Sequence, residues 1–104
     1  MNKNMYVIVR SVGYANDLDD KGYLKLDSVK EIYSVCDSVQ MAKEHIKILK
    51  DETVGLLESN NDKYKVENVE KGALFIITVD RSENDLDDLR FEIGMKRYKL
   101  NALE

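Results

Sequence analysis

Apolar and polar residues follow one another in patterns that predict several strands and one long helix. The apolar runs at residues 6–9 and 74–77 are rich in β-branched and aromatic side chains, which favour strands. Each run leads to the same acidic segment, NDLDD, at residues 16–20 and 84–88, and a shorter stretch of alternating apolar residues follows each copy. The pattern therefore predicts two β-hairpins, each consisting of a strand, an acidic loop and a second strand.

Between the two hairpins, a period of 3.6 residues predicts the longest helix of the chain. Apolar or small side chains recur at steps of three and four residues on one face: Val39, Ala42, Ile46, Leu49, Thr53 and Leu56. Asp37 or Ser38 is suited to be the N-cap, because a short polar side chain there accepts a hydrogen bond from the first turn. The polar residues 58–62 predict the end of the helix, and Gly55 offers an end one turn earlier as the alternative.

Residues 28–36, SVKEIYSVC, fit two structures. Ser28 and Glu31 have the spacing of a capping box, which would extend the helix backward to residue 29. The segment also alternates as a strand, and we favour the strand because Tyr, Val and Ile are concentrated there. Farther along, residues 63–80 predict a hairpin whose tight turn, EKG, precedes the strongest strand, residues 73–80. The predicted fold class is therefore α+β: an antiparallel or mixed sheet of four to six strands with one main helix packed on one face, of the β-β-α-β-β type.

The segment EIYSVCDSVQMAKEHI, residues 31–46, joins the predicted strand to the predicted helix. It resembles a junction in small uncharacterised phage and bacterial domains, where a strand runs into an Asp/Ser cap and an AKExI helix. Those domains are also similar in opening with a YVIV-type strand and closing with one or two strands. The resemblance covers residues 5–80 and implies a ββαββ fold of mobile-element origin. It carries over no catalytic residue, and Cys36 stands where those domains often have an aromatic.

Composition narrows the function classes. The chain of 104 residues is predicted to form a single domain, residues 1–104, with 16 basic and 20 acidic residues and a net charge of −4. One Cys and one His exclude an intramolecular disulfide and a Cys/His zinc site within one chain. No apolar run is long enough to span a bilayer, so we expect a cytoplasmic protein. The mildly acidic balance argues against direct binding of duplex DNA.

The two acidic loops are the candidate site. Their six aspartates are Asp17, Asp19, Asp20, Asp85, Asp87 and Asp88. Closely spaced negative charges on hairpins can imitate a phosphate backbone and occupy the basic cleft of a nucleic-acid-binding protein. Small acidic phage inhibitors of host nucleases, anti-CRISPR proteins among them, resemble this chain in size and charge. That resemblance implies a protein-binding inhibitor whose partner is a larger host protein.

The sequence gives weaker support for a metal site or for an enzyme. An EF-hand is excluded because Ser28 stands at the twelfth position of the first loop, where a bidentate Glu is needed. If both acidic loops lay at one end of the sheet, their carboxylates could still hold a divalent ion weakly. Cys36 and His45 are the elements of a nucleophilic pair, but burial of Cys36 as a small apolar residue is the favoured interpretation. No phosphate-binding or hydrolase motif is present. We therefore predict a protein that is not an enzyme and needs no cofactor or metal.

The alternative function is a small-molecule or nucleotide-binding oligomer. The C-terminal MKRYKL places Lys96, Arg97 and Lys99 around Tyr98, where cations and an aromatic ring can bind phosphates and stack on a base. Lysines also protect an edge strand against aggregation, which is the favoured interpretation of this short run. We expect a monomer or a homodimer. A dimer patch could be formed by the tyrosines Tyr6, Tyr23, Tyr33, Tyr64 and Tyr98.

Overall fold

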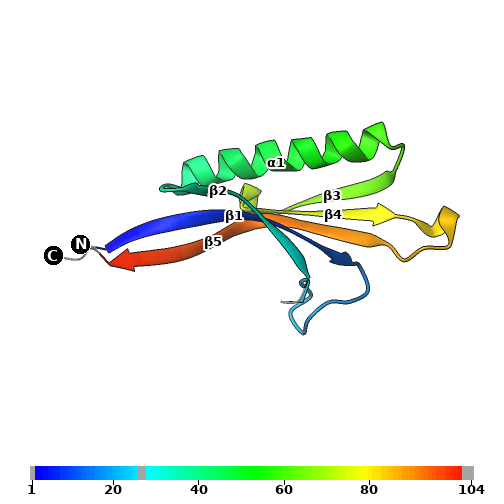
Figure 1. The fold of residues 1–104 in the computed structure, drawn as a ribbon, viewed down its shortest axis with the longest axis horizontal. Helices are drawn as coiled ribbons and strands as arrows, with labels where there is room; N and C mark the ends of the chain where they lie inside the picture. The colour runs from blue at the N-terminus through cyan, green and yellow to red at the C-terminus, as the bar shows by residue number, and fades with distance from the viewer. Residues whose placement is uncertain (1, 26–27, 102–104) are drawn as a thin grey trace.

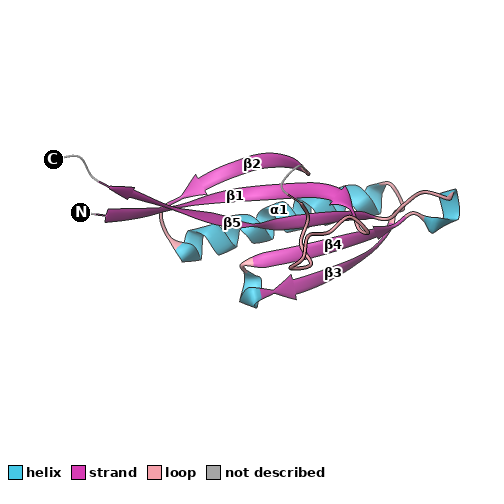
Figure 2. Ribbon diagram, turned by 90° about the horizontal axis from the view of Figure 1, so that it is seen from below, coloured by secondary structure: helices cyan, strands magenta, loops and turns pink. Residues whose placement is uncertain are grey.

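A five-stranded antiparallel sheet with one long helix on one of its faces forms the fold (Figure 1). The computed structural model describes residues 2–25 and 28–101. The strands are β1 (Asn2–Tyr14), β2 (Val29–Cys36), β3 (Lys63–Val69), β4 (Leu74–Asp80) and β5 (Leu89–Asn101), and the helix is α1 (Val39–Ser59). Short 3-10 turns occupy Glu70–Gly72 and Ser82–Asn84. The strands lie in the order β2-β1-β5-β4-β3, with β2 and β3 at the edges (Figure 2). The α+β fold predicted from the sequence is confirmed.

The core lies between α1 and the sheet. The inner stripe of the helix is buried at Ala42, Ile46, Leu49, Thr53 and Leu57. It packs on the sheet residues Ile8, Ile77 and Ile93, which are fully buried. The predicted stripe was wrong at both ends, because Val39 is 43% exposed and Leu56 60%, whereas Leu57 is only 8% exposed. A step of four from Thr53 keeps the stripe centred on the sheet, whereas a step of three turns the side chain toward its rim.

Both ends of the helix follow from local chemistry. Ser38 is the N-cap, and its hydroxyl accepts a hydrogen bond from the backbone N–H of Met41 at 3.1 Å. The helix does not end at Gly55 but continues to Ser59, because a glycine inside a helix costs only about 1 kcal/mol and the buried stripe on both sides outweighs that cost. Residues 29–36 form β2, so the strand interpretation is confirmed and the backward extension of the helix is wrong.

The first hairpin differs from the prediction in its second strand. The residues directly after the first NDLDD segment form a loop, with a single isolated bridge between Leu18 and Leu24, and the strand that pairs with β1 begins only at Val29. Leu24 is buried instead against the sheet face opposite the helix, where its side chain lies 3.0 Å from the position that a Cβ would take on Gly13. Burying Leu24 therefore draws this segment out of the sheet. The second NDLDD segment runs directly into β5, as predicted.

The two central strands outrun their neighbours. β1 and β5 pair along their whole lengths, from Asn2 with Asn101 to Tyr14 with Leu89. Pairing with β2 stops at Tyr6, and pairing with β4 stops at Gly94. The remaining residues of β1 and β5 project as a two-stranded ribbon at one end of a molecule measuring 58 × 28 × 21 Å (Figure 1). The acidic loops leave the sheet at the opposite end.

Candidate functional site

The two acidic loops start side by side. Tyr14, the last residue of β1, pairs with Leu89, the first residue of β5, because the two strands are antiparallel neighbours. The backbone N–H of Ala15 then donates to the carbonyl oxygen of Asp88 at 2.9 Å, which joins the two loops at their bases. Beyond this contact they diverge: the first folds back beneath the open face of the sheet, and the second projects past its end (Figure 1). Both NDLDD segments therefore begin at the end of the sheet where β1 ends and β5 starts, but they extend in different directions.

Three of the six aspartates are engaged within their own loops. One carboxylate oxygen of Asp19 accepts hydrogen bonds from the backbone N–H groups of Lys21 and Tyr23, at 2.9 and 3.0 Å. The bond from Tyr23 is the main reason why the pKa of Asp19 lies below its ordinary value. Asp88 accepts from the backbone N–H of Arg81 at 3.0 Å and closes the second loop. Asp17 forms an ion pair with Lys25 at 2.6 Å.

The other three aspartates, Asp20, Asp85 and Asp87, are exposed and make no hydrogen bond or ion pair through their side chains with any described residue. Residues from both loops line a shallow hollow of about 380 Å³: Ala15, Asn16, Leu86, Asp87 and Asp88. Leu86 is a half-exposed apolar side chain in this hollow. The end of the molecule thus combines unpaired carboxylates with one apolar contact point.

Charge is concentrated at this end. Segments 15–25 and 80–88 contain eight acidic and three basic residues, a net charge of −5, whereas the whole chain carries −4. Lys63 on β3 adds one cation nearby, where it forms an ion pair with Glu83. Focused charge of one sign raises the rate at which an oppositely charged partner is encountered.

A divalent-ion site finds no support in this arrangement. Within residues 2–25 and 28–101, no group of three or more His, Cys, Asp or Glu side chains is placed to hold a metal ion. The loops meet only at their bases, and Asp19 and Asp88 are turned toward backbone N–H groups. A weak divalent-ion site was expected only if both loops lay at the same end of the sheet. The loops do start at the same end, but their carboxylates do not come together.

The structure brings Cys36 and His45 together, which their spacing of nine residues did not indicate. The Cys36 sulfur lies 3.3 Å from Nδ1 of His45, and the Ser34 hydroxyl oxygen lies 2.7 Å from the same nitrogen. Ser34 and Cys36 lie two residues apart on the same side of β2, and His45 lies at the border of the buried stripe of α1. The contact therefore joins the end of β2 to the first half of α1. Cys36 is only 1% exposed, which leaves its sulfur out of reach of a substrate in this conformation. The predicted burial of Cys36 is confirmed.

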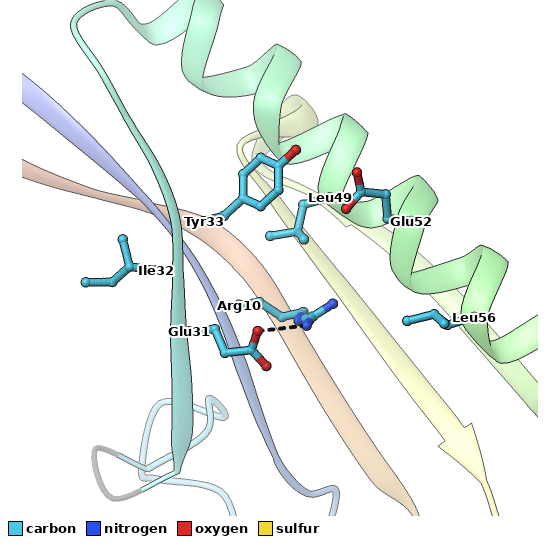
Figure 3. A pocket seen from close by; sticks show the side chains of 7 residues that line it. All are labelled: Arg10, Glu31, Ile32, Tyr33, Leu49, Glu52 and Leu56. Atoms are coloured by element: carbon cyan, nitrogen blue, oxygen red, sulfur yellow. Dashed lines mark hydrogen bonds and ion pairs between the residues drawn. The ribbon is translucent and has the colours of Figure 1, made fainter.

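A groove runs between β2 and α1 on the helix side of the sheet (Figure 3). Its volume is about 310 Å³, and Arg10 of β1 projects into it between the two walls. The guanidinium donates to the Thr53 hydroxyl and to Glu31, both at 3.0 Å. Thr53 is buried and passes its own hydrogen to the carbonyl oxygen of Leu49 at 2.8 Å. Sequence reasoning missed Arg10, although its alternation with Tyr6 and Ile8 places it on the buried side of β1.

Exposed apolar side chains gather on the same two elements. On β2 they are Val29, Ile32, Tyr33 and Val35, and on α1 they are Val39, Met41, Ile48 and Leu56. Ile32, Tyr33 and Leu56 line the groove itself. The groove therefore has apolar walls around a central cation, in addition to the carboxylates of Glu31 and Glu52.

The tyrosines do not form the single patch that the sequence suggested. Tyr6 belongs to the core, and Tyr64 packs against it from β3. Tyr33 contacts His45 edge-on at a ring distance of 6.3 Å on the helix side. Tyr98 pairs with Met5 across the projecting ribbon, far from Tyr23 in the first loop. A shared tyrosine surface is therefore wrong as a basis for a dimer.

Among the described residues, none of the helical segments has the length and apolar character needed to cross a membrane. No family model, curated protein or solved structure matches this chain.

Proposed function

We propose that this chain is a non-enzymatic protein-binding module that docks on a basic surface of a larger partner through its acidic loop end. The observation that carries the proposal is that both NDLDD loops leave the sheet from adjoining bases, so that a net charge of −5 is concentrated in two neighbouring loops. The basic cleft of a nucleic-acid-binding protein is a surface of matching charge. A phage-encoded inhibitor of a host defence nuclease, of the anti-CRISPR kind, is the specific form of this function that we propose.

The loops are suited to binding because their shape is fixed before a partner arrives. Asp19 and Asp88 hold the two loops through backbone hydrogen bonds, which reduces the conformational entropy lost on docking. The unpaired carboxylates of Asp20, Asp85 and Asp87 then provide steering and specificity. Leu86 provides the apolar contact that commonly dominates the affinity of an interface.

Charge reversal tests the proposal. The triple variant Asp20→Lys, Asp85→Lys and Asp87→Lys removes only carboxylates without a described partner. A matched control, Glu44→Lys, Glu67→Lys and Glu70→Lys, reverses three exposed charges outside the acidic loops and outside the groove. We expect a partner captured from host lysate by the unchanged chain and by the control variant, at low but not at high salt, and its loss with the triple variant of the loops. Retention of every captured protein by the triple variant would refute docking through the acidic end.

The groove between β2 and α1 favours a second candidate, binding of a small molecule. Its volume of about 310 Å³ lies at the lower end of the range for ligand pockets, roughly 300–1,000 Å³. Glu31 and Glu52 outnumber Arg10, so the groove disfavours phosphates and suits a cationic ligand with an apolar body. Tryptamine and indole-3-acetate share one aromatic body and differ in charge. We expect tryptamine alone to raise the melting temperature; an equal response to both, or none, would contradict this candidate.

A further inference from the structure

The ribbon that projects at the end opposite the acidic loops is made of residues 3–7 of β1 and 95–99 of β5, and we call it the basic ribbon. Its cross-strand pairs are Asn4 with Lys99, Met5 with Tyr98, Tyr6 with Arg97, and Val7 with Lys96. β2 pairs with Tyr6 and Val7, so only residues 3–5 of β1 lack a neighbour on that side, whereas no described strand pairs with residues 95–99 of β5 on the side of β4. The ribbon is therefore open along its whole β5 edge and along the outer part of its β1 edge.

The charge of this ribbon is of one sign. Its cations are Lys3, Lys96, Arg97 and Lys99, and neither strand segment contains an acidic residue, although acids outnumber bases in the chain. All four cations are exposed, and none forms an ion pair with a described residue. The sequence alone shows only the cluster around Tyr98; strand pairing adds Lys3 and Asn4 beside it.

The cations lie on both faces of the ribbon. Residues directly opposite each other in an antiparallel pair share a face, and neighbours along a strand alternate. Lys96 therefore shares the open face with Val7, whereas Arg97 shares the helix-side face with Tyr6. Lys99 lies on the helix side as well, opposite Asn4. Lysines protect strand edges against aggregation, and four cations without a carboxylate also give this ribbon a local positive charge that attracts phosphates.

We propose that the basic ribbon binds duplex DNA by entering the major groove, with its cations on the flanking phosphates. The major groove of B-form DNA is about 12 Å wide and admits a two-stranded β-ribbon. Its two walls carry phosphates, which suits a ribbon with cations on both faces. The acidic loops lie at the other end of a molecule 58 Å long, where repulsion from DNA orients the ribbon toward the groove. Local charge thus reverses the expectation that the net charge of −4 suggested.

The dependence of affinity on salt measures the number of phosphate contacts. Four contacts predict a slope of about −3.6 for log affinity against log salt, which is a loss of about 150-fold between 50 and 200 mM. The variant Lys96→Gln with Lys99→Gln should halve the slope, so that the loss falls to about 12-fold. The matched variant Lys43→Gln with Lys47→Gln removes two cations from α1 and should keep the slope of the unchanged chain.

The probe is a fluorescent duplex of about twenty base pairs, measured by anisotropy, with a single strand of the same length as the comparison ligand. Tighter binding of the duplex and the two slopes above would support the proposal. Failure to bind the duplex at 50 mM salt, equal or tighter binding of the single strand, or an equal effect of the α1 variant would overturn it. Self-association that is lost in the ribbon variant, without DNA binding, would instead identify the acidic end of a second copy as the ligand. These variants leave the acidic loops unchanged, so the outcome is independent of partner docking.

Discussion

Removing the Thr53 hydroxyl tests how the groove between β2 and α1 is held open. Thr53→Val keeps the shape of the side chain but deprives the Arg10 guanidinium of an acceptor at 3.0 Å. The carbonyl oxygen of Leu49 also loses the hydroxyl donor, but as a helix carbonyl it retains its backbone bond. Arg10 is 19% exposed and recovers part of the lost hydrogen bonding from water in the groove. We therefore expect a loss of about 1.5 kcal/mol in the free energy of unfolding, at the lower end of the range for hydrogen bonds to charged groups.

A double-mutant cycle isolates this interaction. In a domain of this size, such a loss lowers the melting temperature by roughly 6–12 °C. Arg10→Met removes the guanidinium and keeps an extended side chain, and the double variant replaces both polar partners by apolar ones. Urea unfolding followed by circular dichroism should give a coupling energy of about 1 kcal/mol between positions 10 and 53.

The control is Thr78→Val on β4, because no described residue forms a hydrogen bond with the Thr78 side chain and the change should stay within about 0.5 kcal/mol. A coupling energy below about 0.5 kcal/mol would show that Arg10 and Thr53 act independently. A stabilised Thr53→Val variant would show that burying the hydroxyl costs more than its two hydrogen bonds contribute. Either result would refute the account of how the groove is positioned.

Three further measurements test other parts of the structure. Leu57→Ala should destabilise the fold by about 2–5 kcal/mol and Leu56→Ala by less than about 1 kcal/mol in urea unfolding, since only Leu57 is buried; equal losses would contradict the observed stripe. Hydrogen bonds from Tyr23 to Asp19 and from Ser82 to Asp80 hold the pKa of each carboxyl below its ordinary value of 3.8. The stability that these carboxylates contribute should therefore be present above pH 3.8 and be lost as the pH falls through their folded-state pKa. Asp19→Asn and Asp80→Asn should flatten this acid limb, and an unchanged limb would argue against the prediction. The phenol of Tyr64 donates a hydrogen bond to Glu58, which raises the pKa of Tyr64 above 10.0. Glu58→Gln should lower the pKa of Tyr64 in an ultraviolet titration, and an unchanged pKa would rule out that bond.

Elements with a strong local signal were predictable from the sequence. The period of α1, its Ser38 cap and the β-branched runs of β1 and β4 all agree with the structure, because local propensity and burial favour the same outcome. The segment after the first NDLDD was not predictable in this way. Its alternation resembles a strand, but Leu24 finds a buried position on the open face, and the backbone N–H of that residue bonds to Glu92 of β5. A contact across 68 residues leaves no local trace.

The composition of the candidate site was predictable from the sequence, but the role of each aspartate was not. Both loops are acidic and lie at one end, yet the six aspartates divide according to geometry that the motif does not encode. The same letter sequence follows β1 in the first copy and precedes β5 in the second, so equivalent residues meet different neighbours. Asp19 bonds within its own loop, whereas Asp87, its counterpart in the second copy, has no described partner.

The distribution of charge depends on the fold rather than on sequence order. A single segment of the sequence contains charges from both ends of the molecule, because β5 begins beside the acidic loops and ends in the basic ribbon. Segments 1–36 and 81–104 each contain nearly equal numbers of acids and bases for this reason. The antiparallel pairing of β1 with β5 sorts these charges, placing Lys3 with the basic end of β5 and Asp17 with the acidic end. A small net charge thus conceals two surfaces of opposite sign, and reversing charge at one end while leaving the other intact tests the two proposed binding surfaces separately.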